Sequence, residues 1–121
     1  MGEIATSNRQ ITMFYSSKSA RAKQTLALAK AEGLAIEDID ILKIKLTGTQ
    51  IVELAERLHR DVVNLVNQVH PSYTSSFEHH NFSTNDWTKM IQHNPQIMKQ
   101  PITLRGDTTI LGVTPTDIIK I

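Results

Sequence analysis

The first third of the chain places an apolar run, a small polar turn and an amphipathic segment in succession. Residues 11–15 (ITMFY) are rich in β-branched and aromatic side chains, residues 16–19 are mostly small and polar, and residues 20–28 repeat apolar side chains at helical spacing. This pattern predicts a strand, a loop and a helix that ends in a left-handed cap at Gly33. The loop leads directly into the N-terminus of the helix. The loop N–H groups and the positive end of the helix dipole therefore form a natural site for an anion or a thiolate.

The next segments change from partial alternation to helical periodicity. Residues 34–44 predict a second strand, which follows a helical crossover and therefore pairs with the first strand in parallel. Thr49 is the predicted N-cap of a helix that runs to about His59. Residues 62–69 continue a helical period and predict a third helix, although their β-branched side chains lower the helix propensity of the segment.

A long polar loop at residues 72–82 leads to a capped helix. Ser83 and, three residues later, Asp86 predict a capping box, and the apolar positions that follow predict the buried side of a helix. Asn94, which precedes a proline, marks the end of this helix.

The end of the chain predicts a hairpin and a short helix. Residues 102–104 and 109–111 flank a turn at Gly106, which is typical of two antiparallel strands. Thr114 and Pro115 predict the start of a last helix. The summed order is strand, helix, strand, three helices, two strands and helix, which is the order of a thioredoxin-like domain.

Length, composition and charge fit one soluble domain. The 121 residues are 40% apolar and 21% charged, and the formal net charge of +1 comes from interspersed charges, so a nucleic-acid interface is not expected. No apolar run is long enough for a bilayer, and residues 1–10 resemble a polar tail rather than a signal peptide. We therefore expect a cytoplasmic protein that binds neither membranes nor nucleic acids.

The chain contains no cysteine, which excludes disulfides, thiolate metal sites and every cysteine-based reaction within it. Histidine is a common metal ligand, but none of the five histidines belongs to a firm ligand pattern. We therefore predict no metal and no cofactor. The histidines are His59, His70, His79, His80 and His93.

Three segments, in this order, carry a family resemblance: ITMFYSSKSARAKQTL, HNPQIMKQPITLRG and ILGVTP. Together they resemble the arsenate reductase and Spx-like proteins of the thioredoxin superfamily. The resemblance implies one α/β domain over residues 1–121, with a mixed four-stranded thioredoxin-like (glutaredoxin-like) sheet and a helical insertion at residues 45–95. It also implies a catalytic cysteine in the first loop, a cis proline at Pro101 before the third strand, and an oxyanion-binding arginine just before that proline.

This sequence departs from the family at the positions that carry the chemistry. Carried over by position, the nucleophilic cysteine falls on Ser19 and the second cysteine of Spx-like switches falls on Ala22. A serine hydroxyl gains far too little from a helix N-terminus to replace a thiolate, and no general base is visible nearby. Three supporting arginines of the family fall on Gln100, Asn64 and Val113. We therefore expect no arsenate reductase activity.

The candidate binding residues surround the first loop. Ser19 is either a remnant of the site or a helix N-cap, and the cap is the commoner role for a serine in this place. Several cations could lie near the loop, so weak anion binding is one interpretation. The candidates are Ser16, Lys18, Ser19, Arg21, Lys23, Lys99, Gln100, Pro101 and Arg105.

Two functions are compatible with these observations. The first is a non-catalytic protein-interaction or regulatory module with an unknown partner, as Spx-like relatives imply; its binding would be indifferent to oxidants. The alternative is a residual thiol-handling protein that binds an oxyanion or glutathione at the first loop. Three aromatic residues of the polar loop either form a partner-binding patch or pin the loop to the core, the commoner case; they are Tyr73, Phe77 and Phe82.

Overall fold

A mixed four-stranded sheet in the order β2-β1-β3-β4 organises one of the two compact units of the chain. The structure is a computed structural model that describes residues 8–67, 83–112 and 114–121. The sheet unit comprises the described residues up to Ile44 and those from Gln100 onward, and the second unit comprises those between Lys45 and Lys99. The predicted mixed sheet of four strands is confirmed.

The strands are paired as the sequence predicts, with a parallel crossover first and a hairpin last. β1 is parallel to β2 and antiparallel to β3, and β3 is antiparallel to β4. The central strands β1 and β3 are almost entirely buried, as expected for β-branched and aromatic runs in the middle of a sheet. Their bounds are β1 Ile11–Tyr15, β2 Ile36–Asp40, β3 Ile102–Arg105 and β4 Thr108–Leu111.

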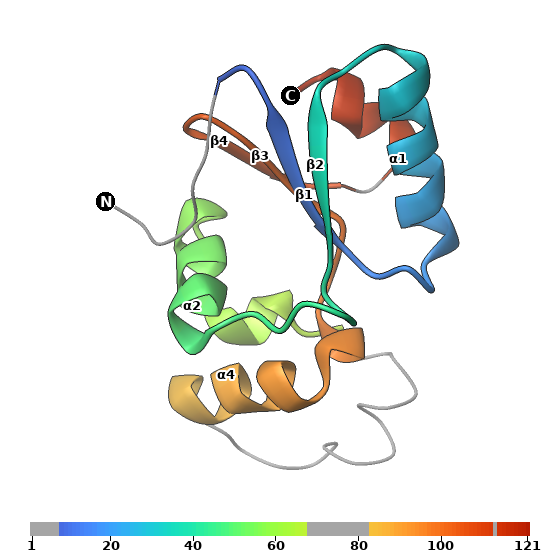
Figure 1. Ribbon diagram of the computed structural model, residues 1–121. Coiled ribbons are helices and arrows are strands. Elements are labelled where there is room, and N and C mark those ends of the chain that lie inside the picture. The colour runs from blue at the N-terminus through green and yellow to red at the C-terminus, as the bar shows by residue number, and fades with distance from the viewer. Residues whose placement is uncertain (1–7, 68–82, 113) are drawn as a thin grey trace. The chain divides into compact units, whose positions relative to one another are not determined.

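Helix α1 (Ala20–Ala31) and the short C-terminal 3-10 helix η3 (Pro115–Ile119) cover one face of the sheet (Figure 1). A cluster of Ile11, Ala29 and Ile118 forms the centre of this layer. The chain leaves α1 through Gly33, whose φ of +71° is the left-handed conformation that the sequence predicts there. The last predicted helix is thus present, but as a 3-10 helix.

The second strand is shorter than predicted. It ends at Asp40 instead of continuing to Ile44. The Asp40 carbonyl accepts hydrogen bonds from the N–H groups of Lys43 and Ile44, and its carboxylate accepts one from Leu42. These bonds turn the chain directly after Asp40, as a short acidic side chain often does at the start of a turn.

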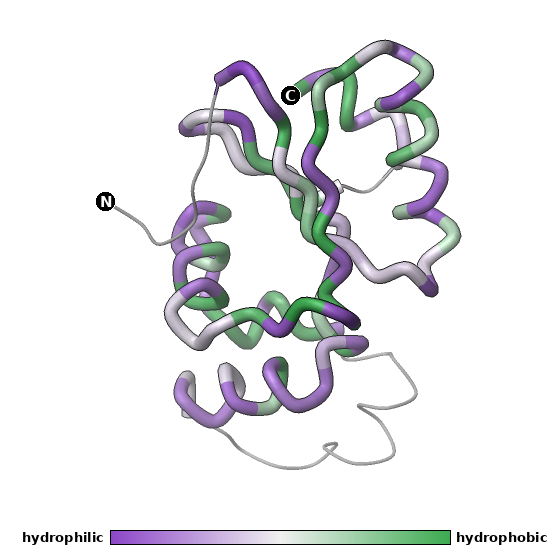
Figure 2. The backbone as a smooth tube through the Cα atoms, in the orientation of Figure 1, coloured by the Kyte–Doolittle hydropathy of each residue, from purple (hydrophilic) through white to green (hydrophobic). Residues whose placement is uncertain are grey.

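Among its described residues, the second unit contains the α-helices α2 (Gly48–Arg57) and α4 (Thr84–His93). The prediction of Thr49 as the N-cap of α2 is wrong, because Thr47 accepts from the Gln50 N–H and Gln50 in turn accepts from the Thr47 N–H. This capping box places the N-cap two residues earlier than predicted. In Figure 2 hydrophobic positions alternate with hydrophilic ones along α2, which is typical of a helix with one buried side.

The predicted third helix over residues 62–69 is only partly correct. The chain forms a 3-10 helix, η1 (Val62–Leu65), and then Val66 becomes extended and pairs with Met98 in an isolated antiparallel bridge. Met98 directly follows a second 3-10 helix, η2 (Pro95–Ile97). The β-branched valines favour this extended pairing over a continuing helix. Residues 68–82 lie outside the described residues.

The capping box of α4 is confirmed and predicts a measurable effect. The Ser83 hydroxyl accepts from the Asp86 N–H at 3.2 Å, and the Asp86 carboxylate accepts from the Ser83 N–H at 3.1 Å. We expect Ser83→Ala to lower the free energy of unfolding by about 1 kcal/mol. Asn85→Ala, in the same exposed turn, is the control and should change it by less than about 0.5 kcal/mol. Equal effects of both substitutions in urea denaturation would contradict this role.

Candidate functional site

The loop from Ser16 to Ser19 leaves the central strand β1 between its two neighbours in the sheet. In the parallel pair Tyr15 lies beside Asp40, the last residue of β2. In the antiparallel pair Phe14 lies beside Ile102, so the same register brings Gln100 to the level of Ser16. The sheet therefore delivers one side chain from each neighbouring strand to the loop.

All four backbone N–H groups of the loop are occupied by acceptors of the protein itself. The Ser16 N–H donates to the Gln100 side-chain oxygen at 3.2 Å, and the Ser17 N–H donates to Asp40 Oδ1 at 3.2 Å. The Lys18 N–H donates to the Ser16 hydroxyl at 3.2 Å, and the Ser19 N–H donates to the Ser16 carbonyl at 3.0 Å. The donors that could hold an external anion are thus engaged in internal hydrogen bonds.

Ser19 is the N-cap of α1. Its backbone is extended, and its hydroxyl oxygen accepts from the Ala22 N–H at 3.2 Å. No carboxylate or imidazole within the described part of the chain hydrogen-bonds to this hydroxyl, so nothing there would remove its proton. The commoner of the two interpretations of Ser19, the helix cap, is the one that the structure contains.

Asp40 is the buried charge of this site. Its residue is 8% exposed, and Oδ1 accepts from both the Ser17 N–H and, at 3.0 Å, the Leu42 N–H. Burial raises the pKa of Asp40, but the Ser17 hydroxyl, the two N–H donors and the charge of Lys43 outweigh it and hold the pKa below its ordinary value. The side chain is therefore a carboxylate at neutral pH.

Gln100 and Pro101 enter the site from β3. The peptide bond between them is cis, as predicted. Pro101 is buried, and its carbonyl accepts from the Gly112 N–H at 2.9 Å. Gln100, where the family resemblance implies an arginine, holds the loop by accepting a hydrogen bond from Ser16, and it adds no positive charge.

The predicted cations are only partly brought to the loop. Lys18, Arg21 and Lys23 lie on the loop and the first turn of α1 with exposed side chains. Arg105 lies at the far end of β3, about 10 Å along the strand from Ile102, and its Nε donates to the Asn8 carbonyl. The structure does not bring Arg105 to the loop.

Other predicted positions lie elsewhere in the chain. Lys99 and Asn64 belong to the second unit, where their N–H groups donate to the carbonyls of Leu65 and Asp61. No group of three potential metal-ligating side chains occurs within residues 8–67, 83–112 and 114–121. Several positions lie outside the described residues, namely Val113, Tyr73, Phe77, Phe82, His70, His79 and His80.

The two remaining histidines, His59 and His93, are both exposed. His93 bonds through Nδ1 to the Lys89 carbonyl of its own helix at 2.8 Å. His59 has a φ of +56° just after α2. Neither belongs to a group of three potential metal-ligating side chains among the residues that the structure describes.

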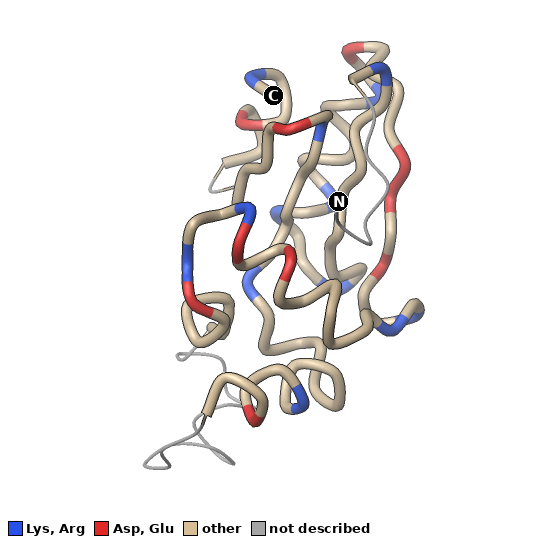
Figure 3. The backbone as a smooth tube through the Cα atoms, turned by 90° about the vertical axis from the view of Figure 1, so that its left-hand side faces the viewer, with Lys and Arg blue, Asp and Glu red and all other residues tan. Residues whose placement is uncertain are grey.

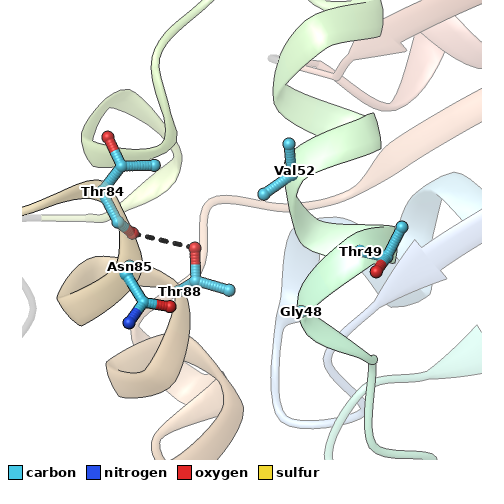
Figure 4. A pocket seen from close by; sticks show the side chains of 6 residues that line it. All are labelled: Gly48, Thr49, Val52, Thr84, Asn85 and Thr88. Carbon is cyan, nitrogen blue, oxygen red and sulfur yellow. Dashed lines mark hydrogen bonds between the residues drawn. The ribbon is translucent and has the colours of Figure 1, made fainter.

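A pocket in the second unit was not expected from the sequence. It has a volume of about 570 Å³ and lies at the first turns of α2 and α4 (Figure 4). Thr88 lines it, and its hydroxyl donates to the Thr84 carbonyl of the same helix at 2.9 Å. Gly48 permits the approach of the two helices, since a Cβ there would lie 3.3 Å from Thr88 Cγ2. No charged side chain lines this pocket; its lining is Gly48, Thr49, Val52, Thr84, Asn85 and Thr88.

Charge is spread along the chain and does not form one basic block. Acidic and basic positions follow one another along the backbone in Figure 3. In the part of the chain that the structure describes, no helix is long and apolar enough to cross a bilayer.

Asp40 is the residue that sequence analysis missed. The partial alternation of residues 34–44 predicts a strand that runs through Asp40 instead of ending there. Its pairing with Ser17 depends on the parallel register of β1 and β2, which sequence periodicity does not determine. An aspartate followed by an early end of alternation is nevertheless a turn signal that could have indicated its role.

Comparison with known proteins identifies the fold. No family model matches the chain, and a search of curated proteins found no significant match. Among solved structures, it is similar to an arsenate reductase from Vibrio cholerae, with a TM-score of 0.82 and 17% identity over 93% of this chain and 98% of the other. A candidate arsenate reductase from Yersinia pestis has a TM-score of 0.82 and 18% identity over 92% and 99% of the two chains.

An arsenate reductase-related protein from Brucella melitensis is similar as well, with a TM-score of 0.70 and 14% identity over 97% of this chain and 100% of the other. At such identities the likeness concerns the fold alone. The chain therefore has the thioredoxin-like fold of arsenate reductases, without any cysteine.

Proposed function

We propose that this protein is a non-catalytic protein-interaction or regulatory module that retains an arsenate reductase-like fold. The observation that carries the proposal is the first loop: its four N–H groups bond internal acceptors, and its Ser19 hydroxyl caps the helix. A surface of the fold, rather than the loop chemistry, is then what a partner protein would bind.

Thiol chemistry at a helix N-terminus needs a group that ionises near neutral pH. A thiol does so when the helix dipole and nearby cations lower its pKa, but a serine hydroxyl stays protonated and needs a general base. Ser19 has no such base among the described residues. Gln100, in addition, brings an amide instead of the charge that would stabilise an arsenate oxyanion.

The alternative, a protein that binds an oxyanion or glutathione at the same loop, needs free donors there. The Ser16 and Ser17 N–H groups would have to leave Gln100 and Asp40 first. The anionic Asp40 would also repel a second anion placed beside it. These contacts disfavour anion binding at the loop and therefore favour the interaction module over the alternative.

We expect neither the native chain nor Ser19→Cys to reduce arsenate. A new thiol at position 19 would share the loop with Asp40 and face Gln100 in place of an arginine, so the arsenate oxyanion would lack its positive partners. The measurement is arsenate-dependent thiol oxidation with glutathione and glutaredoxin present.

The arsenate reductase from Vibrio cholerae serves as the positive control of this assay. Turnover by the native chain would overturn the proposed function. Turnover by Ser19→Cys alone would show that the missing thiol, and not the rest of the site, is what separates this chain from an enzyme. Ser19→Ala is the matched control for any change in folding at the helix cap.

A further inference from the structure

We propose that Asp40 is an internal anion that occupies the Ser17 N–H of the Ser16–Ser19 loop and, with its negative charge beside the loop, closes it to phosphate-like ligands. The proposal rests on the proposed function, in which the loop no longer binds a substrate, and it names the group that keeps the loop closed. The contact is autoinhibitory in the sense that removing the carboxylate frees the Ser17 N–H and removes a negative charge from the site.

The geometry places the carboxylate where an external anion would lie. A loop between a strand and the N-terminus of a ten-residue or longer helix presents N–H groups and the positive end of the dipole. Here Asp40 Oδ1 takes the Ser17 N–H from this set. Because β1 and β2 are parallel and in register at Tyr15 and Asp40, the side chain reaches the loop from the adjacent strand.

Asp40 is buried, and neighbouring groups compensate its negative charge. The residue is 8% exposed, so its charge is largely removed from water, and it is compensated by two N–H donors and the nearby Lys43. Its second oxygen, Oδ2, is buried and has no hydrogen-bond partner among the described residues. The buried charge therefore depends on Ser17 and Leu42 to stay in place.

Asp38 provides a contrast on the same strand. It is exposed, and its carboxylate accepts from the Tyr15 hydroxyl at 3.0 Å instead of from the loop. The two acids lie two residues apart on β2 and so share a face, but only Asp40 bonds a loop N–H group. Asp38 is thus a matched control for the loss of one negative charge.

The test is a titration of the full-length protein with inorganic phosphate at pH 7, followed by amide chemical shifts. In the native chain and in Asp38→Ala we expect no saturable shift between Ser16 and Ala22. In Asp40→Ala we expect saturable shifts there, with phosphate bound at least about tenfold more tightly, because the freed Ser17 N–H can make a charge-assisted hydrogen bond to the anion and no carboxylate repels it.

Saturable binding to these amides in the native chain, as tight as in Asp40→Ala, would overturn the proposal. So would a folded Asp40→Ala whose loop amides do not respond to phosphate. These outcomes are separate from those of the arsenate reduction assay, because that assay reports turnover in chains that keep Asp40.

Asp40→Asn keeps the side-chain size and covers the case in which Asp40→Ala does not fold. We expect the Ser17 and Leu42 amides of Asp40→Asn to exchange their hydrogens at least about tenfold faster than in the native chain, because a neutral acceptor holds N–H groups less strongly than a carboxylate. Asp38→Asn should leave both amides unchanged. Unchanged exchange in Asp40→Asn would contradict the role of the charge.

Discussion

Replacing Ile118 by alanine is expected to lower the free energy of unfolding by about 2–5 kcal/mol. Ile118 is 2% exposed and packs with Ile11 and Ala29 where η3 covers the sheet. Ile118 is the buried residue of η3, so its truncation removes apolar contacts and leaves a cavity between this short 3-10 helix and the sheet. Urea denaturation followed by circular dichroism measures the effect.

The next residue is the control for this prediction. Ile119 lies on the same 3-10 helix but is 51% exposed, so Ile119→Ala should change the free energy of unfolding by about 0.5 kcal/mol or less. If the two substitutions had equal effects, the layer formed by η3 would not be a part of the core. The pair separates burial from any general effect of shortening an isoleucine.

Trp87→Ala is expected to destabilise the second unit by about 3–5 kcal/mol. Trp87 is the only tryptophan of the chain, is 7% exposed and lies on the buried side of α4 with Ile91. Its indole is among the largest apolar groups that folding removes from water, so its loss leaves a large cavity. The measurement is denaturation followed by circular dichroism, since the variant lacks tryptophan fluorescence.

Lys89→Ala lies on the exposed side of the same helix and should change the stability by less than about 0.5 kcal/mol. Trp87→Phe keeps an aromatic side chain and should fall between the native chain and Trp87→Ala. A Trp87→Ala variant as stable as Lys89→Ala would mean that α4 is not held by its buried side.

Two features separate the first loop of this chain from a thiol site. The chain has no cysteine, and Gln100 and Asp40 bond the Ser16 and Ser17 N–H groups. Each neighbouring strand thus supplies one acceptor, and the loop is fixed on both sides. The experiments on Ser19 and Asp40 test these two features separately. The first measures arsenate reduction, and the second measures phosphate binding.

Local signals were sufficient for the elements that form from their own residues. The strand at residues 11–15 follows from its β-branched and aromatic content. The caps at Ser19 and Ser83 follow from hydroxyl side chains three residues before the N–H groups that they accept from, and the Asp86 carboxylate completes the capping box from three residues after Ser83. The absence of cysteine likewise needs no structure, and it alone excludes thiol chemistry within the chain.

Where segments distant in sequence compete for the same backbone groups, local signals failed. Val66 leaves the predicted helix because Met98 offers it an extended partner. The pocket at Gly48 and Thr88 similarly requires the close approach of two helices. The prediction of Thr49 as a cap failed for a local reason, because Gln50 lies three residues after Thr47 and returns its hydrogen bond.

The sequence by itself determined the order of the strands, the helix caps at Ser19 and Ser83 and the absence of thiol chemistry, since each depends on residue types or on neighbours in the chain. Only the tertiary structure decided which side chains accept hydrogen bonds from the Ser16 and Ser17 N–H groups of the first loop. The pairing of Tyr15 with Asp40 and of Phe14 with Ile102 brings a carboxylate and an amide from opposite sides of β1 to its N–H groups. That meeting depends on strand register, and register is set by packing across the sheet rather than by any one segment.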